Sequence, residues 1–204
     1  AGEVVRVHKF AETISATLNG KDTLALVQRR PETNGVGVRE NSFTGVLIPP
    51  MPPSPDFSHI EYADSIALFN GKNLDGWQPL NLRQVNGWLA DDGVLVNDAE
   101  HVEGAEYVNF GNLKTEGEFE DFTLSLEVLV PAEGNSGVYL RGIYEIQVSD
   151  SYGRELDSHN MGAVYSRLTP RSAAEKKAGT WQSLEMTLWK RHITIVLNGT
   201  TIIA

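Results

Sequence analysis

The sequence predicts an all-β fold, a sandwich or jelly roll of antiparallel sheets, and three observations support this. Apolar and polar residues alternate with period two over residues 122–130 and again over 138–149, as in half-buried strands. Turn-forming pairs such as Asn19-Gly20, Asn70-Gly71 and Asn198-Gly199 recur between apolar runs. No stretch shows a convincing amphipathic helical period. Many short strands separated by turns are typical of these β architectures.

Composition narrows the class of protein further. The chain has 204 residues, 41% of them hydrophobic and 22% charged, which is ordinary for a globular protein. A formal net charge of −10 argues against nucleic acid and anionic membrane surfaces as partners. The absence of cysteine excludes disulfides and thiolate-bound zinc. No run of 18 apolar residues predicts a membrane span, and no signal peptide is visible in the chain.

The first part of the chain predicts a small β appendage over residues 1–48. Residues 4–10 form an expected strand, residues 14–28 an expected hairpin around Asn19-Gly20, and residues 42–48 a further strand. Five prolines then fall within residues 49–55. Proline removes backbone donors and favours extended chain, so residues 49–64 are expected to be a stiff linker. The main domain is expected over residues 65–204.

Within the main domain, strands are expected around the turns at Asn70-Gly71 and Asp92-Gly93, and then over residues 119–130. In the last of these, Phe122, Leu124 and Leu126 share one face, while Glu127 lies on the other. Residues 150–180 form the longest irregular segment, and long loops in compact domains are often functional. Strands at 181–190, 192–197 and 200–203 complete the chain.

The stretch from Gly134 to Ser151 is the most informative. It predicts one long strand, or two strands with a kink at Gly142. Parity assigns Val138, Leu140, Tyr144, Ile146 and Val148 to one face, and Tyr139, Arg141, Glu145, Gln147 and Ser149 to the other. Charged and amide groups are costly in a core, so the second face is expected to line a wet groove or to be an ordinary solvated surface.

Seven motifs in order resemble the 3-keto-disaccharide hydrolase family, long known as a domain of unknown function. They cover the chain from about residue 65 to the C-terminus and are the following: Phe69-Asn-Gly-Lys-Asn-Leu-Asp-Gly-Trp77, Trp88 with Asp92-Gly93, Asn135-Ser-Gly-Val-Tyr-Leu-Arg141, Tyr144-Glu-Ile-Gln-Val-Ser-Asp150, Gly162-Ala-Val-Tyr165, Ala178-Gly-Thr-Trp181 and Leu197-Asn-Gly199. The resemblance implies a concanavalin A-like jelly-roll sandwich. It also implies action on glycosides oxidised to a ketone at C3, in extracytoplasmic (periplasmic or secreted) bacterial proteins.

The resemblance also carries an expectation about the end of the chain. Family members continue beyond the Asn-Gly hairpin with further strands, whereas this sequence stops at Ala204. C-terminal strands of the sandwich are therefore expected to be missing, with an open sheet edge or another chain supplying them.

A ketone at C3 acidifies the hydrogen on C2, so that a base removes it and the C1 oxygen leaves by β-elimination. Such a site needs a base, a donor for the enolate oxygen and an acid for the leaving group. The candidate bases are Glu145 and Glu127, the candidate donors are Arg141 and Gln147, and His159 is a candidate acid or second base. Each of two candidates has an alternative to its role in the site. Arg141 could form a structural ion pair, and His159 could be an ordinary loop histidine.

Other residues are expected to bind the sugar. Tyr139 and Tyr165 are candidates for stacking, and Asp150 directly follows the polar strand. Trp77 and Trp88 are assigned to the core. No cofactor is expected. Calcium held by Glu145, Asp150 and Asp157 is the alternative, although no dense Asp-x-Asp-x-Asp loop is present.

Two alternative functions fit the same fold. A non-catalytic, lectin-like carbohydrate-binding module would keep the aromatic and amide side chains but would not need a base. A glucanase-like hydrolase would carry its acids as Glu-x-Asp-x-x-Glu on one strand, and this spacing is absent from the sequence.

Overall fold

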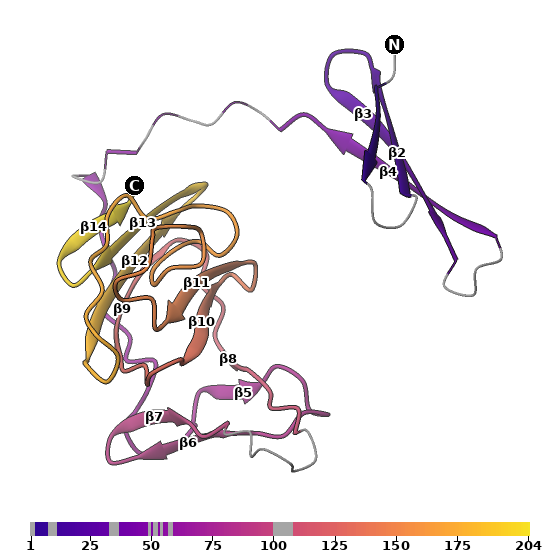
Figure 1. The fold of residues 1–204 in the computed structure, drawn as a ribbon. Helices are drawn as coiled ribbons and strands as arrows, with labels where there is room; N and C mark the ends of the chain where they lie inside the picture. The colour runs from indigo at the N-terminus through magenta and orange to yellow at the C-terminus, as the bar shows by residue number, and fades with distance from the viewer. Residues whose placement is uncertain are drawn as a thin grey trace. The chain divides into compact units, whose positions relative to one another are not determined.

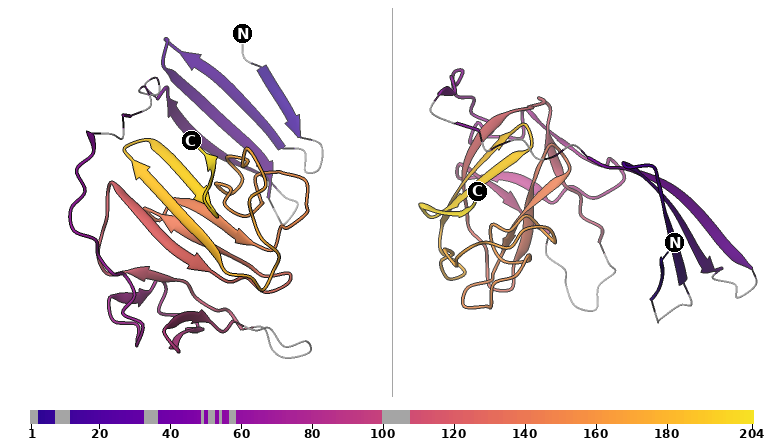
Figure 2. Two further views of the ribbon diagram at one scale, coloured as in Figure 1. Left: turned by 90° about the vertical axis from the view of Figure 1, so that its left-hand side faces the viewer. Right: turned by 90° about the horizontal axis from the view of Figure 1, so that it is seen from above.

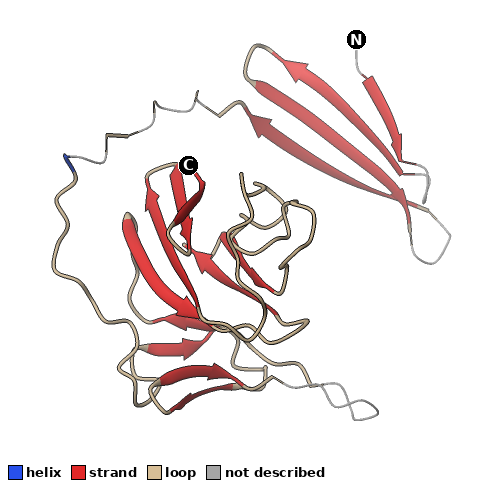
Figure 3. Ribbon diagram, turned by 60° about the vertical axis from the view of Figure 1, so that its left-hand side comes forward, coloured by secondary structure: helices blue, strands red, loops and turns tan. Residues whose placement is uncertain are grey.

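Contacts divide the chain into two units, Ala1–Pro52 and Pro53–Ala204. The computed structural model describes residues 3–7, 12–32, 37–48, 50, 53, 55–56, 59–99 and 108–204. Strands and loops make up almost all of this part of the chain (Figures 1 and 3), which confirms the predicted all-β class. None of the described residues forms a helix with the length and hydropathy of a membrane span.

The first unit is an antiparallel meander of four strands in the order β1-β2-β3-β4. Its strands are β1 (Glu3–Val7), β2 (Glu12–Asn19), β3 (Thr23–Pro31) and β4 (Val38–Val46). The predicted hairpin at Asn19-Gly20 is confirmed, and Gly20 takes the positive φ of 76° that this tight turn requires. The strand predicted over residues 4–10 is described only to Val7, and residues 8–10 lie outside the described part.

Two short antiparallel strand pairs precede the sandwich in the second unit. β5 (Trp77–Pro79) pairs with β8 (Leu113–Thr115), and β6 (Trp88–Asp91) pairs with β7 (Val94–Asn97). The indole Nε1 of Trp77 donates to the carbonyl of Leu68 over 2.6 Å, and that of Trp88 donates to the carbonyl of Gly111 over 3.0 Å. Both tryptophans are therefore half-buried packing residues, in agreement with their sequence assignment.

The sandwich has two layers, which Figure 2 shows from two sides. One layer is a four-stranded antiparallel sheet of order β14-β13-β12-β9, and the other is built on the β10–β11 hairpin. The bounds are β9 Phe122–Val128, β10 Asn135–Leu140, β11 Tyr144–Ser149, β12 Gln182–Trp189, β13 His192–Leu197 and β14 Thr200–Ile203.

Apolar side chains from both layers meet in one core. Leu140, Ile146 and Val148 of the hairpin are buried against Met186 and Ile195 of the four-stranded sheet. Phe122, Leu124, Leu126 and Val138 pack against them while half-buried. The positions in the core that alternation predicted are confirmed for the following seven residues: Phe122, Leu124, Leu126, Val138, Leu140, Ile146 and Val148. Each large side chain buried here contributes about 1.5–3 kcal/mol of transfer free energy.

A third extended segment lies along the second edge of β11. The amide of Gln147 donates to the carbonyl of Ala163 over 2.9 Å, and the amide of Tyr165 donates to the carbonyl of Glu145 over 2.9 Å. Ile146 and Val164 form an antiparallel bridge. Residues 163–165 are therefore a one-bridge extension of the second layer.

The chain reverses within the stretch that was expected to be one strand or two kinked strands. Arg141 and Gly142 have φ values of 53° and 64°, and the amide of Ile143 donates to the carbonyl of Leu140. This is a tight hairpin turn, so Tyr139 pairs with Glu145 across β10 and β11. The polar face of β9, which carries Glu127, does not lie beside the hairpin in one sheet, because β9 pairs with β12.

The two outer strands of the four-stranded sheet differ in their surroundings. Ile202 and Ile203 of β14 are buried, and the amide of Arg171 donates to the carbonyl of Ile202 along the outer edge. The outer edge of β9 has no strand partner among the described residues. An additional chain along an open edge stays a prediction.

Candidate active site

The outward face of the second layer carries a row of three side chains. Tyr139 of β10 lies directly opposite Glu145 of β11, and Tyr165 lies next to Glu145 on the other side. Alternation along each strand turns these side chains away from the core residues Leu140 and Ile146. A carboxylate is thereby flanked by two phenols on one face of the layer.

Tyr139 and Glu145 are joined by a hydrogen bond. The phenolic hydroxyl of Tyr139 donates to Oε2 of Glu145 over 2.8 Å. This bond to the carboxylate, together with partial desolvation and the negative charge of Glu145, raises the pKa of Tyr139 above its ordinary value of 10.0. The carboxylate is thereby held in one orientation by its neighbour.

Gly137 leaves the space in which the Glu145 side chain lies. A Cβ atom at this position would clash with Oε1 and Cγ of Glu145. Gly137 belongs to β10 and lies opposite Gln147. The absence of a side chain here is a steric requirement of the Glu145 rotamer.

An open cavity of about 410 Å³ lies over this row. It is lined by Tyr139, Ile143, Glu145, Tyr165, Ser166 and Arg167. Its volume falls within the range of small-ligand sites, about 300–1,000 Å³. The guanidinium of Arg167 lies 6.0 Å from the centroid of the Tyr144 ring, within cation–π distance. The cavity therefore combines one carboxylate, one guanidinium and two phenols.

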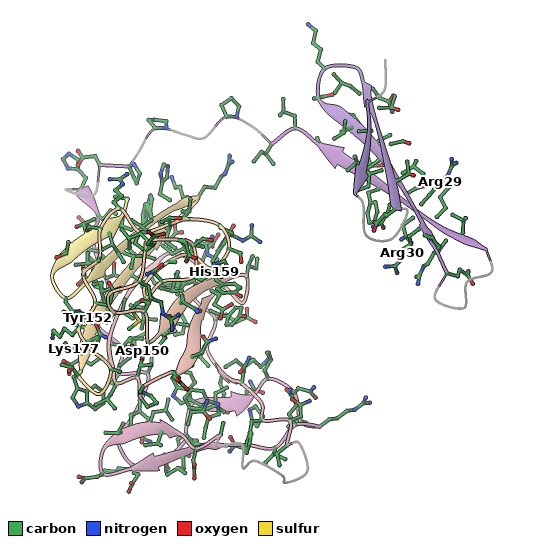
Figure 4. All side chains as sticks on the ribbon, in the orientation of Figure 1. Arg29, Arg30, Asp150, Tyr152, His159 and Lys177 are labelled. Carbon is green, nitrogen blue, oxygen red and sulfur yellow. The ribbon has the colours of Figure 1, made fainter. Side chains whose placement is uncertain are left out.

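His159 lies beside the cavity, on the loop that follows β11 (Figure 4). Its ring packs edge-on against Tyr165, with centroids 4.9 Å apart at 84°. Nε2 lies 3.2 Å from Oγ of Ser166, and Nδ1 lies 3.5 Å from Oδ1 of Asp157. The side chain is 51% exposed, so the imidazole is accessible to solvent or to a ligand. Two cavity-lining residues thus orient the histidine.

Gln147 shares the face of Glu145 but does not line the cavity. Its side chain is 4% exposed, Nε2 donates to Oδ1 of Asn135 over 3.1 Å, and Oε1 has no hydrogen-bond partner. An unpaired buried acceptor costs stability. Gln147 lies in the second layer, without access to the open cavity.

The sequence expectation for Arg141 is wrong, because this residue belongs to the hairpin turn and not to the polar strand face. Its guanidinium donates to the carbonyls of Glu120 and Lys190 and to Oδ1 of Asp121, over 2.6, 3.1 and 2.7 Å. Asp121 also accepts from the amide of Lys190. Arg141 is therefore a structural brace between the hairpin and the four-stranded sheet.

Glu127 does not join Glu145, and the expected convergence of the two carboxylates is wrong. Glu127 is exposed on β9, in a separate groove of about 630 Å³ on the outward face of the four-stranded sheet. That groove is lined by Ser125, Leu126, Glu127, Ser183, Leu184, Glu185, Val196 and Gly199. Because β9 pairs with β12 and not with the hairpin, its polar face belongs to the other layer.

Asp150 is also engaged away from the cavity. Its Oδ2 accepts the amide of Glu133 over 3.1 Å, and its own amide donates to the carbonyl of Gly134. These bonds hold the turn between β9 and β10. In the described part of the chain, no three His, Asp or Glu side chains gather as a metal site, and calcium at Glu145, Asp150 and Asp157 stays an untested alternative. The expected lack of a cofactor stays a prediction.

Ser166, Arg167 and Asp157 lie at or beside the cavity and were not predicted to bind substrate or catalyse. The chain turns at Ser166, so the alternation of a strand does not continue from Tyr165 to Arg167, and no sequence pattern pointed to Arg167. Ser166 has a φ of 56°, which no sequence pattern signalled. Asp157 lies in a loop rich in turn-forming residues, where an aspartate is common. Only its contact with His159 marks it as a residue of the candidate site.

Comparisons with known proteins agree with this architecture. The sequence model of the 3-keto-alpha-glucoside-1,2-lyase-like domain matches residues 64–204. Two crystal structures from Parabacteroides distasonis, both provisionally designated glycosyl hydrolases, share the fold. One is 24% identical, with a TM-score of 0.55, and covers 67% of this chain and 70% of its own. The other is 22% identical, with a TM-score of 0.53, and covers 77% and 80%. A search of curated protein sequences found no match.

Proposed function

Because this chain belongs, over residues 64–204, to the 3-keto-alpha-glucoside-1,2-lyase-like family, we propose that it cleaves the glycosidic bond of 3-keto-glycosides at the Glu145 cavity. The family resemblance expected from the sequence motifs is confirmed, and with it the expectation of a glycoside-cleaving enzyme domain. The position of Glu145 between two phenols in an open cavity is the observation that supports the site most strongly.

The proposed reaction is an elimination followed by addition of water. A carboxylate oxygen of Glu145 takes the proton from C2, and the C–H electron pair forms the enolate of the C3 ketone. The enolate electrons then form the C1–C2 double bond, while the C1–O bond breaks toward the leaving group. Addition of water across the new double bond gives the free 3-keto sugar, so the net change is hydrolysis.

The other polar groups fit the remaining tasks. Among the described residues that line the cavity, Arg167 alone carries a cation, and its guanidinium can balance the enolate charge. Tyr139 holds the Glu145 carboxylate through its 2.8 Å bond. His159, oriented by Ser166 and Asp157 beside Tyr165, supplies a proton to the departing C1 oxygen. Glu145 and His159 both lie next to Tyr165. In the proposed reaction Glu145 is the base for the C2 proton, and His159 is the acid for the C1 oxygen.

The test compares oxidised and unoxidised substrates. The protein is incubated with a 3-keto-α-glucoside, a 3-keto-β-glucoside and the parent glucosides, and product release is followed by mass spectrometry. Cleavage is expected only with the 3-keto sugars, because the parent sugars lack the acidified C2 hydrogen. Equal cleavage of an unoxidised glucoside would contradict the elimination and favour a glucanase-like mechanism.

Two matched variants locate the chemistry. Glu145→Gln should lower the cleavage rate about 10²–10⁴-fold, since the amide cannot accept the proton. Glu127→Gln makes the same change on the other layer and should leave the rate unaltered. If both variants keep the wild-type rate, Glu145 is not the base. If the wild type binds 3-keto-glycosides without cleaving them, the domain is a lectin-like module.

Two features of the sequence prediction remain proposals. A small carbohydrate is the expected partner, in keeping with the cavity volume of about 410 Å³. An extracytoplasmic location follows from the family resemblance, and fractionation of cells that express the full-length protein would test it.

A further inference from the structure

The four-stranded sheet of the first unit has one apolar face. Register places Ala16, Leu26 and Phe43 side by side across β2, β3 and β4, and places Leu18 beside Leu24. Because side chains alternate along a strand, these residues point to the same side. We name this surface the apolar face; its apolar members are Ile14, Ala16, Leu18, Leu24, Leu26 and Phe43. Gln28 and Asn41 lie on the same side, in the row of Ile14. The opposite side carries hydroxyl groups, from Thr13, Ser15, Thr17, Ser42 and Thr44, together with Val27, Val38, Val46 and the Arg29–Glu40 ion pair.

Among the described residues of the first unit, none covers the apolar face. None of the described side chains of this sheet is buried, and Leu18 and Phe43 are 65% and 53% exposed. A sheet with one apolar face is stable when that face packs against a second layer, because burial contributes about 25 cal/mol per Å². The unit therefore lacks half of a two-layer structure.

The area of the apolar face suits a specific interface. β2, β3 and β4 have 8, 9 and 9 residues. With strands about 4.8 Å apart and about 3.4 Å per residue, four strands present about 500 Å² on one side. Two such faces would bury about 1,000 Å² together, which is about the lower limit of a specific protein interface.

Charges at one end of the apolar face are complementary to a second copy of the same face. By parity, Glu12 of β2, Arg30 of β3 and Arg39 of β4 lie on this side. Arg30 is directly opposite Arg39, and like charges in this position destabilise a sheet. The pairing of Thr13 with Arg29 puts Glu12 at the height of Arg30 in its own sheet. Oε1 of Glu12 accepts a hydrogen bond from Nε2 of Gln28 in the same sheet. Figure 4 labels Arg29 and Arg30 at this end of the sheet.

The placement of these charges selects one symmetry. A twofold axis parallel to the strands lays β2 of one copy over β3 of the other, with both charged ends together. Glu12 then faces Arg30 of the second copy, in both directions. An axis across the strands would instead set the charged end against Leu18 and Leu24, at a desolvation cost. The first arrangement buries the apolar residues of both copies and also places Glu12 opposite Arg30 of the second copy.

We propose that the apolar face binds the same face of a second copy of this chain. The two sheets form a sandwich whose strand directions differ by about 30°, as in other face-to-face sheets. The contact is isologous, so each residue pair occurs twice. The second copy thus provides the missing layer of the first unit.

Sedimentation of the full chain tests this directly. At micromolar concentrations the wild type should sediment with twice the mass of one 22.4 kDa chain. Phe43→Glu, on the apolar face, should give single chains. Thr44→Glu, the next residue and on the opposite face, should leave the dimer intact. A wild type that is monomeric at tens of micromolar, or equal loss in both variants, overturns the proposal.

Exchange of the charges of Glu12 and Arg30 shows whether a variant loses the contact between the two copies or loses its fold. Glu12→Arg alone and Arg30→Glu alone should each raise the dimer dissociation constant about tenfold, and the double variant should restore it. A double variant no better than the singles contradicts the proposed symmetry.

A cysteine probe distinguishes a second copy from another part of the same chain. The protein has no cysteine, so Ala16→Cys introduces a single thiol on the apolar face. A short bis-maleimide should join two chains through it, whereas the same reagent on Thr17→Cys should not. A monomeric Ala16→Cys protein whose thiol resists maleimide would mean that the chain itself covers the face, and this result also overturns the proposal.

Discussion

The hydroxyl of Tyr139 donates a 2.8 Å hydrogen bond to Oε2 of Glu145 across β10 and β11. The two residues are opposite each other in the register of the hairpin, and Gly137 leaves room beside them for the carboxylate. This pair forms the centre of the candidate active site, and two of the predictions below concern it.

Replacement of Tyr139 by phenylalanine removes the bond but keeps the ring. We expect a fall in cleavage rate of about fivefold, because the loss of one well-aligned hydrogen bond is worth about 1 kcal/mol. The circular dichroism spectrum should not change, since Tyr139 is 53% exposed. An unaltered rate would show that the bond does not orient the catalytic carboxylate.

The hydrogen bond between Tyr139 and Glu145 leads us to expect that part of the folding stability is lost at alkaline pH. The raised pKa of Tyr139 means that the folded protein keeps this proton longer than the unfolded chain does. Its contribution to stability is therefore fully present below pH 10 and is lost as pH rises through the folded pKa. In a titration followed at 295 nm, Tyr139→Phe should remove a tyrosine that ionises above pH 10. Removal of an ordinary tyrosine signal instead would contradict the assigned cause.

A methyl group at Gly137 should displace the Glu145 side chain. Gly137→Ala places a Cβ against Oε1 and Cγ of Glu145, so the carboxylate must adopt another rotamer. We expect a loss of cleavage rate of about tenfold or more, in keeping with the sensitivity of catalysis to small misplacements. Gly179→Ala is the control for general strain, because a Cβ there meets no atom although φ is 76°. An active Gly137→Ala enzyme would mean that this rotamer is not needed.

Arg141 should matter for stability and not for chemistry. Arg141→Gly suits the φ of 53° in the turn but deletes the guanidinium that bonds Glu120, Lys190 and Asp121. We expect the free energy of unfolding in urea to fall by about 1.5–3 kcal/mol, the range for bonds to charged groups. The exposed Arg154→Gly should change it by less than about 0.5 kcal/mol. A stable but inactive Arg141→Gly protein would return Arg141 to the catalytic site.

Gln147 is expected to tolerate an apolar replacement. Gln147→Met keeps the length of the side chain and removes the buried Oε1 that lacks a partner. The exposed Asn135 can exchange its lost bond for water. The free energy of unfolding should therefore stay within about 1 kcal/mol of the wild type or rise. A large rise in KM without loss of stability would indicate that Gln147 contacts the substrate.

The sequence by itself determined which side of each strand faces the core. Leu140, Ile146 and Val148 are buried and Tyr139 and Glu145 point outward, because alternation is a local property of extended backbone. The turn at Asn19-Gly20 could also be predicted from the sequence, since only a few residue types tolerate positive φ. The order of the family motifs also required no structure.

Only the tertiary structure decided which polar faces meet. Parity alone placed Arg141 with Glu145, but the chain reverses at Arg141, and a turn breaks the alternation on which parity depends. Glu127 has the expected orientation on its strand, yet β9 pairs with β12, and strand pairing is chosen by contacts between residues far apart in sequence. His159 reaches the cavity through an irregular loop without any period, so its contact with Tyr165 depends on the packing of that loop against the second layer.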